Sequence, residues 1–103
     1  MNYGLNETTV TKIRAVLARF PEVEKAILYG SRAKGKFKTG SDIDLTLCGK
    51  NLTPELRATI ASELDDLLLP YTIDLSLCSE LKHPDLLEHI RRVGKVFYQR
   101  ETT

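Results

Sequence analysis

The chain has 103 residues, of which 42% are hydrophobic and 28% are charged, and its formal net charge is +1. This length supports one hydrophobic core, and the near-neutral balance excludes a protein that binds nucleic acid or a membrane surface through its overall charge. No apolar run approaches the roughly 20 residues of a membrane-spanning helix, and the N-terminus lacks a secretory signal pattern. The two cysteines have no CxxC spacing, so we expect reduced thiols and a cytoplasmic protein.

The first half of the chain predicts a helix, a strand, a loop and a second strand. Asn6 can cap a helix that runs to about Arg19, because the apolar residues that follow it recur on one helical face. Residues 23–29 form a short apolar run that stops at a glycine, which predicts a strand. Residues 31–40 are small, basic and rich in glycine, so we expect a loop or one helical turn. Residues 42–48 alternate polar and apolar, as a half-buried strand does.

The second half predicts a helix, a strand, a second helix and a short edge strand. Thr53, followed by a proline and a glutamate, is a helix start, and we expect this helix to reach Pro70. Residues 71–78 alternate again as a third strand. Residues 84–93 predict the last helix, and residues 95–99 (KVFYQ) an edge strand. The predicted apolar stripes are Leu56, Ile60, Leu64, Leu67 and Leu68 in the first helix, and Leu86, Leu87, Ile90 and Val93 in the last.

This order of helices and strands predicts an α/β fold with α+β-like character. We expect a single mixed β-sheet of three to four strands with helices packed on it. The chain contains no low-complexity tract, linker or change in composition that would mark a second unit. We therefore expect residues 1–103 to form a single domain.

Two of the predicted strands carry almost the same six residues. Ile43–Cys48 reads IDLTLC and Ile73–Cys78 reads IDLSLC, within flanking sequences that are otherwise unlike, so the pair is not a structural repeat. Alternation along a strand puts the aliphatic residues on one face and Asp44 or Asp74 on the other. Asp42 shares the face of Asp44, at a Cα separation of about 6.5–7 Å. If the two strands are neighbours, as a helical crossover favours, Asp74 joins this pair.

Three carboxylates at one place oppose each other's ionisation unless a cation neutralises them. Oxygen ligands favour Mg²⁺ or Mn²⁺ over zinc, so Asp42, Asp44 and Asp74 are candidate ligands of two such ions. Two divalent ions can stabilise both the attacking and the leaving oxygen of a phosphoryl transfer. The alternative is that these aspartates are solvated residues at the starts of strands.

The segment before the aspartates, YGSRAKGKFKTGSD over residues 29–42, is basic. Gly30 allows a ligand to approach the backbone closely, and Ser31 offers a hydroxyl and a backbone N–H. The segment carries four positive charges and no acidic residue before Asp42, namely Arg32, Lys34, Lys36 and Lys38. Such a loop suits a triphosphate, although it lacks the P-loop pattern; the alternative is an ordinary solvated turn.

The combined pattern resembles a known family. GSRAKG at residues 30–35 and SDIDL at residues 41–45 are similar to the signature of the DNA polymerase beta-like nucleotidyltransferase superfamily, and Asp74 matches its third carboxylate. The resemblance extends from Val23 to about Gln99 and is closest to the minimal nucleotidyltransferases (MNT).

The resemblance implies a role for each residue of the pattern. Gly30 and Ser31 would bind the nucleotide phosphates, together with Arg32, whose role in the family is less defined. Asp42 and Asp44 would bind the metal ions. Asp74 would bind the metal that activates the attacking hydroxyl and would help to take its proton.

The resemblance also implies a reaction and a partner. An NTP, ATP by preference, would transfer its nucleoside monophosphate to a hydroxyl of another protein and release pyrophosphate. Minimal members are paired with a small helical HEPN-type protein and act as its antitoxin, so we expect such a partner in trans. The competing hypothesis is a binding module that neutralises its partner by complex formation without catalysis. The sequence leaves homo-oligomerisation open and indicates neither a membrane nor a nucleic-acid partner.

The remaining polar residues are interpreted as structural. We expect Cys48 and Cys78 to be small core residues and His89 to face solvent. The matching Thr46 and Ser76 are interpreted as packing residues of the two similar strands.

Overall fold

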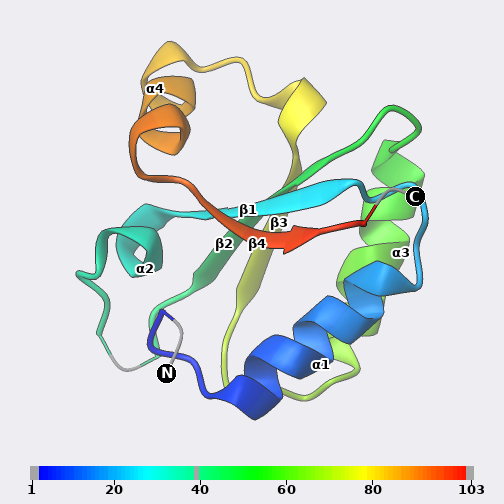
Figure 1. The fold of residues 1–103 in the computed structure, drawn as a ribbon, viewed down its shortest axis with the longest axis horizontal. Coiled ribbons are helices and arrows are strands. Elements are labelled where there is room, and N and C mark those ends of the chain that lie inside the picture. Colours follow the sequence, from blue (N-terminus) through cyan, green and yellow to red (C-terminus); the bar gives the residue numbers. More distant parts are fainter. Residues whose placement is uncertain (1–2, 39, 102–103) are drawn as a thin grey trace.

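The computed structural model describes residues 3–38 and 40–101, which form one sheet with helices on it (Figure 1). The sheet has four strands in the order β3-β2-β1-β4. In chain order the elements are α1 (Glu7–Ala18), β1 (Lys25–Tyr29), α2 (Gly30–Lys34), β2 (Ile43–Cys48), α3 (Pro54–Asp65), β3 (Ile73–Leu77), the 3₁₀-helix η1 (Cys78–Glu80), α4 (Pro84–Val93) and β4 (Lys95–Gln99).

The sheet is mixed because two kinds of connection build it. Helix α3 joins β2 to β3, and these two strands are parallel, as expected for a crossover connection. Strand β1 lies between β2 and β4 and is antiparallel to both. Strand β4 pairs with β1 at the end of the strand order and is therefore an edge strand. The predicted α/β fold with one mixed sheet and the predicted edge strand are therefore confirmed.

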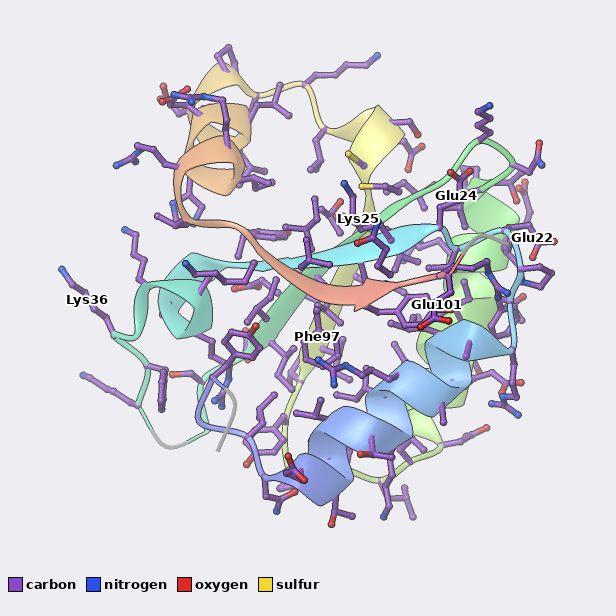
Figure 2. All side chains as sticks on the ribbon, viewed as in Figure 1. Glu22, Glu24, Lys25, Lys36, Phe97 and Glu101 are labelled. Carbon is purple, nitrogen blue, oxygen red and sulfur yellow. The ribbon has the colours of Figure 1, made fainter. Side chains whose placement is uncertain are left out.

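The helices lie on both faces of the sheet. Helices α1 and α3 contact each other and cover one face, whereas α2 and α4 contact each other beside β1 on the opposite side (Figure 1). The core lies between the sheet and the α1–α3 pair, and Phe97 of β4 points into it below the sheet (Figure 2). Lys36, in the loop after α2, extends outward (Figure 2). Among the described residues, no helix combines the length and the apolar character needed to cross a membrane.

Local sequence explains where two of the helices start. The Asn6 side chain accepts the Thr9 N–H at 2.8 Å, and the Thr53 hydroxyl accepts the Leu56 N–H at 3.1 Å. Each bond satisfies one of the N–H groups that the first turn of a helix leaves unpaired. Both predicted caps are confirmed.

The predicted apolar stripes are wrong at two leucines. Helix α3 ends at Asp65 rather than near Pro70, and Leu68 lies beyond it with φ of +54° and 88% of its surface exposed. The left-handed backbone at Leu68 turns the chain away from the helix axis toward β3. Leu87 of α4 is 42% exposed, and α4, which packs on α2 and β1, buries none of its residues completely.

Candidate active site

The two similar six-residue segments lie side by side in register. Asp44 in β2 is the direct partner of Asp74 in β3, and Thr46 is the partner of Ser76. The aliphatic residues of β2 belong to the core under α1 and α3, so alternation places Asp44 on the opposite face. Asp42 immediately precedes β2 and is exposed. The second and third strands are thus neighbours, the arrangement that a helical crossover favours, and their pairing aligns two carboxylates.

The surroundings of Asp44 oppose its negative charge. Partial burial raises the pKa of Asp44, and the negative charges of Asp74 and Asp42 raise it further. None of the ion pairs formed within residues 3–38 and 40–101 involves one of these three aspartates. The site is thus a concentration of negative charge that a bound cation would relieve.

The donor set fits a hard divalent cation, because all three side chains offer carboxylate oxygens. Over the described part of the chain, however, the side chains do not close into a group of three or more metal-ligating residues. The structure thus provides ligands of the right chemistry, two of them on adjacent strands, in an arrangement that is not yet a closed coordination shell.

Gly30, at the start of the basic segment, packs against the Asp44 carboxylate. Its φ is +77°, a left-handed conformation that side chains rarely adopt, and a Cβ at this position would overlap Oδ2 of Asp44. Helix α2 starts at Gly30, so Ser31 follows in its first turn and is partly buried. A glycine is required here because the turn packs directly on a carboxylate.

Tyr29 is a residue of this site that sequence reasoning missed. It is the register partner of Asp44 and is 9% exposed. Burial raises the pKa of Tyr29, and the charges of Asp44 and Asp74 act in the same direction, against an opposing influence of the Ser76 hydroxyl. Among the residues that the structure describes, the buried Ser76 Oγ has no hydrogen-bond partner, so its hydroxyl acts on Tyr29 through proximity.

The structure buries Arg32, which the resemblance placed among the phosphate-binding residues. Its side chain is 2% exposed, and the guanidinium donates to the Ser41 carbonyl through Nε (3.1 Å) and Nη2 (2.8 Å) and to the Tyr3 carbonyl through Nη1 (2.9 Å). Its central carbon lies 5.3 Å from the Phe37 ring centroid and 4.9 Å from that of Tyr71. Its donors join the N-terminal segment at Tyr3 to Ser41 before β2, and its stacking on Tyr71 adds the segment before β3.

His89 is predicted to face solvent, but its side chain contacts Gly30 and Tyr29. Its Nε2 accepts the Gly30 N–H at 3.0 Å, and its ring lies at 80° to that of Tyr29 in a T-shaped contact with a centroid distance of 6.3 Å. Burial lowers the pKa of His89, as do the positive charges of Lys34 and Arg92. The contact joins residues 59 positions apart, so no local pattern could have indicated it.

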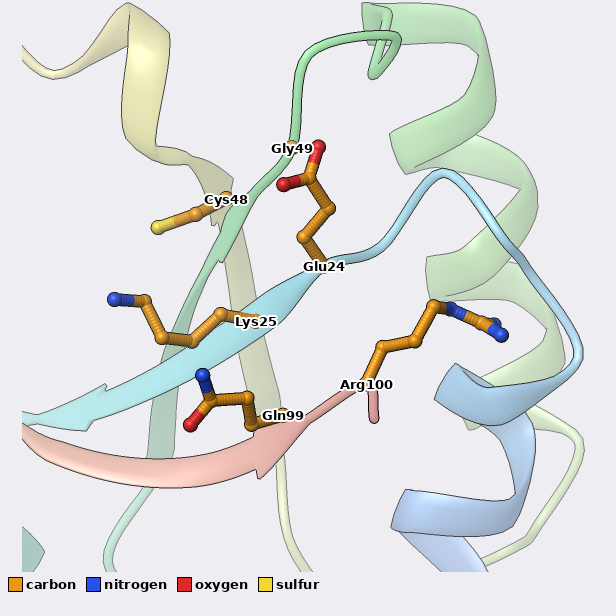
Figure 3. Close-up of a pocket in the computed structure, with 6 residues that line it drawn as sticks. All are labelled: Glu24, Lys25, Cys48, Gly49, Gln99 and Arg100. Carbon is orange, nitrogen blue, oxygen red and sulfur yellow. The ribbon is translucent and has the colours of Figure 1, made fainter. Parts of the chain in front are cut away.

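A separate cavity lies at the other end of the strands. It has a volume of about 390 Å³ and is lined by Glu24, Lys25, Cys48, Gly49, Gln99 and Arg100. In Figure 3 the Arg100 side chain points away from those of Lys25 and Gln99. The cavity sits where β1 begins and β2 ends, whereas Tyr29 and Asp44 lie at the opposite ends, so it contributes nothing to the carboxylate site.

Comparison with known proteins identifies the family. Residues 11–103 match the model of the family described as polymerase beta, nucleotidyltransferase. The comparison with curated proteins gives no match.

Several solved structures share the fold. A chain of a toxin–antitoxin crystal structure with AMP-PNP is 23% identical, with 94% of this chain and 76% of that chain covered and a TM-score of 0.69. A chain in the structure of a tri-AMPylated Shewanella oneidensis HEPN toxin in complex with MNT antitoxin is 20% identical, with 93% and 74% covered and a TM-score of 0.68. A chain of the toxin–antitoxin MntA–HepT is 21% identical, with 92% and 74% covered and a TM-score of 0.68.

At these identities the solved structures show a common fold, and the family model, which covers most of the chain, adds the class of enzyme. The GSRAKG turn and the paired aspartates lie within the matched residues. The chain therefore belongs to the polymerase beta family of nucleotidyltransferases.

Proposed function

We propose that this protein transfers AMP from ATP to a hydroxyl group of a helical HEPN-type partner protein, as the antitoxin of a toxin–antitoxin pair. The observation that carries the proposal is the register pairing of Asp44 with Asp74 directly beside the Gly30–Ser31 turn. The similar folds of a toxin–antitoxin with AMP-PNP and of a complex with an AMPylated HEPN toxin support the choice of nucleotide and partner.

In this proposal the residues divide into two groups. Asp42, Asp44 and Asp74 hold Mg²⁺ or Mn²⁺, which supplies neutralising charge for the triphosphate. Gly30 and Ser31 form the turn against which the phosphates lie. Arg32 belongs to neither group, because its guanidinium is bonded to carbonyls inside the protein.

The reaction requires little covalent chemistry from the protein. The acceptor oxygen forms a bond to the α-phosphorus, the bond from that phosphorus to the bridging oxygen of the β-phosphate breaks, and pyrophosphate leaves. The proton of the acceptor hydroxyl passes to a carboxylate. Asp74 suits this step, because it is the exposed member of the aligned pair, open to a second protein. Positioning and electrostatics then account for most of the rate.

We place the reaction in the cytoplasm, where ATP and a reducing environment coexist. Cys48 and Cys78 are both free in the structure, which is compatible with that compartment. We further propose that residues 1–103 act as one catalytic domain, with the acceptor supplied by the partner.

The experiment is co-expression with the partner and measurement of the partner's mass. We expect wild-type protein to add the mass of one or more AMP groups, and the double substitution Asp42→Asn and Asp44→Asn to reduce transfer at least about a hundredfold. The matched control is Asp65→Asn at the exposed end of α3, which should transfer normally. Full transfer by the double variant contradicts the proposal, and a stable complex without any mass change favours the binding-module alternative.

A further inference from the structure

Gly30 is held from two sides by residues far away in the sequence. On one side the Asp44 carboxylate packs so closely that a Cβ could not fit. On the other, the Gly30 N–H donates to Nε2 of His89 at 3.0 Å. The position of the turn relative to the carboxylates therefore depends on α4, the helix that carries His89.

Helix α4 has few other means of fixing this turn. None of its residues is completely buried, and Leu87 is 42% exposed. It contacts α2 and β1, and the His89 and Tyr29 rings form a T-shaped pair within that contact. Since apolar packing of α4 is incomplete, the directional hydrogen bond to Gly30 is the contact through which α4 can fix the turn.

The His89 ring is in a form that can accept the hydrogen bond from the Gly30 N–H. A ring nitrogen accepts only when it carries no proton, so the bond assigns the neutral tautomer with its hydrogen on Nδ1. The cations Lys34 and Arg92 lie near the ring and disfavour a second proton, in agreement with the lowered pKa. The ring is thereby kept in the form that the Gly30 N–H requires.

We propose that His89 is a positioning residue of the nucleotide site: it fixes the Gly30–Ser31 turn against Asp44 and leaves Ser31, rather than the Gly30 amide, to contact the phosphates. This inference rests on the proposed function and deepens it. The Gly30 N–H already has a partner, whereas the Ser31 hydroxyl follows it in the same turn. His89 acts through Gly30 and touches no reacting atom.

Two amide side chains of different length test the bond. In His89→Gln the side-chain oxygen can occupy the place of Nε2, whereas in His89→Asn it reaches only the place of Nδ1. His83→Asn is the control, because His83 is exposed and its side chain makes no capping bond. The readouts are hydrogen exchange of the Gly30 amide in the free protein and the Kd for AMP-PNP with Mg²⁺.

We expect His89→Asn to exchange the Gly30 amide about tenfold faster and to bind AMP-PNP about five- to tenfold more weakly, the range that one lost hydrogen bond gives. In steady-state transfer the same variant should raise KM for ATP and leave kcat nearly unchanged. His89→Gln should restore all of these values to within about twofold of wild type, and His83→Asn should match wild type throughout. His89→Leu provides a second variant without an acceptor, should His89→Asn fail to fold.

The inference is overturned if the variants without an acceptor bind AMP-PNP as wild type does, or if Gly30 exchange is unchanged in them. These failures differ from a failure of the proposed function. If the wild type does not bind AMP-PNP, or if Asp42→Asn with Asp44→Asn still transfers nucleotide, the proposed function falls as well.

Discussion

At the scale of single residues, Asp44 occupies a position that disfavours its charged form. It packs on Gly30, pairs with Tyr29 on one side and with Asp74 on the other, and is partly withdrawn from water. Its carboxylate therefore ionises at a cost that a neutral side chain would avoid. Sites that bind cations commonly keep such a charge, since the bound cation offsets the unfavourable free energy of holding it there.

Asp44→Asn should therefore stabilise the metal-free protein at neutral pH. The folded-state pKa of Asp44 is raised above its ordinary value of 3.8, so its contribution to stability is present at low pH and is lost as pH rises through that raised pKa. In EDTA at pH 7 we expect Asp44→Asn to melt about 1–4 °C higher than wild type, with the difference vanishing near pH 3. Added Mg²⁺ or Mn²⁺ should raise the Tm of wild type and not that of the variant. A lower Tm for Asp44→Asn in EDTA would contradict this prediction.

Cys48 should be slow to react. Burial, together with the neighbouring Cys78 thiol, raises the pKa of Cys48 to about 12, and only the thiolate is nucleophilic. At pH 8 we expect iodoacetamide to alkylate Cys48 in the folded protein more than about tenfold slower than in urea, as followed by mass spectrometry of the Cys48 peptide. Equal rates in the two states would show that the thiol is accessible and ordinary.

At the scale of elements, the site depends on how separate segments are tied together. Strands β2 and β3 align the two aspartates, α2 begins at Gly30 against Asp44, and α4 reaches the same turn through His89. Arg32 joins the N-terminal segment at Tyr3 to the segment that ends at Ser41. The loss of one of these contacts should therefore also affect elements that carry none of the three aspartates.

Arg32→Lys should destabilise the protein although it keeps the charge. Lysine cannot donate twice to the Ser41 carbonyl while also reaching Tyr3, and it stacks less well between Phe37 and Tyr71. We expect a loss of about 2–4 kcal/mol in the free energy of unfolding, measured in urea.

Arg19→Lys is the matched control for this substitution. Arg19 pairs with Glu63 between α1 and α3 and its side chain is 61% exposed, so it should lose less than about 1 kcal/mol. Equal losses for the two variants would mean that burial of Arg32 contributes nothing to stability.

At the scale of the whole molecule, one core under α1 and α3 supports the sheet whose other face carries the carboxylates. Leu45 lies in that core at 0% exposure and is adjacent in sequence to Asp44, whereas Leu68 is 88% exposed. We expect Leu45→Ala to lower the free energy of unfolding by about 2–5 kcal/mol and Leu68→Ala to change it by less than about 0.5 kcal/mol. Urea unfolding of both variants measures this, and a large loss at Leu68 would place it in a packed environment after all.

The sequence by itself determined the local features of this protein. The caps at Asn6 and Thr53, the alternation in IDLTLC and IDLSLC, and the order of helices and strands are each read within a few residues, because hydrogen-bonding periods and capping are local. The GSRAKG and SDIDL segments likewise indicated the family, which the family model then confirmed.

Only the tertiary structure decided which distant residues meet. It put Asp44 opposite Asp74 in parallel register, turned Arg32 inward onto carbonyls, and brought His89 to the Gly30 amide. The same packing ended α3 at Asp65 and exposed Leu68, which the helical pattern had placed inside. Such contacts depend on how elements pack across the whole chain, and a pattern read along the sequence contains no information about the side chain that arrives from another helix.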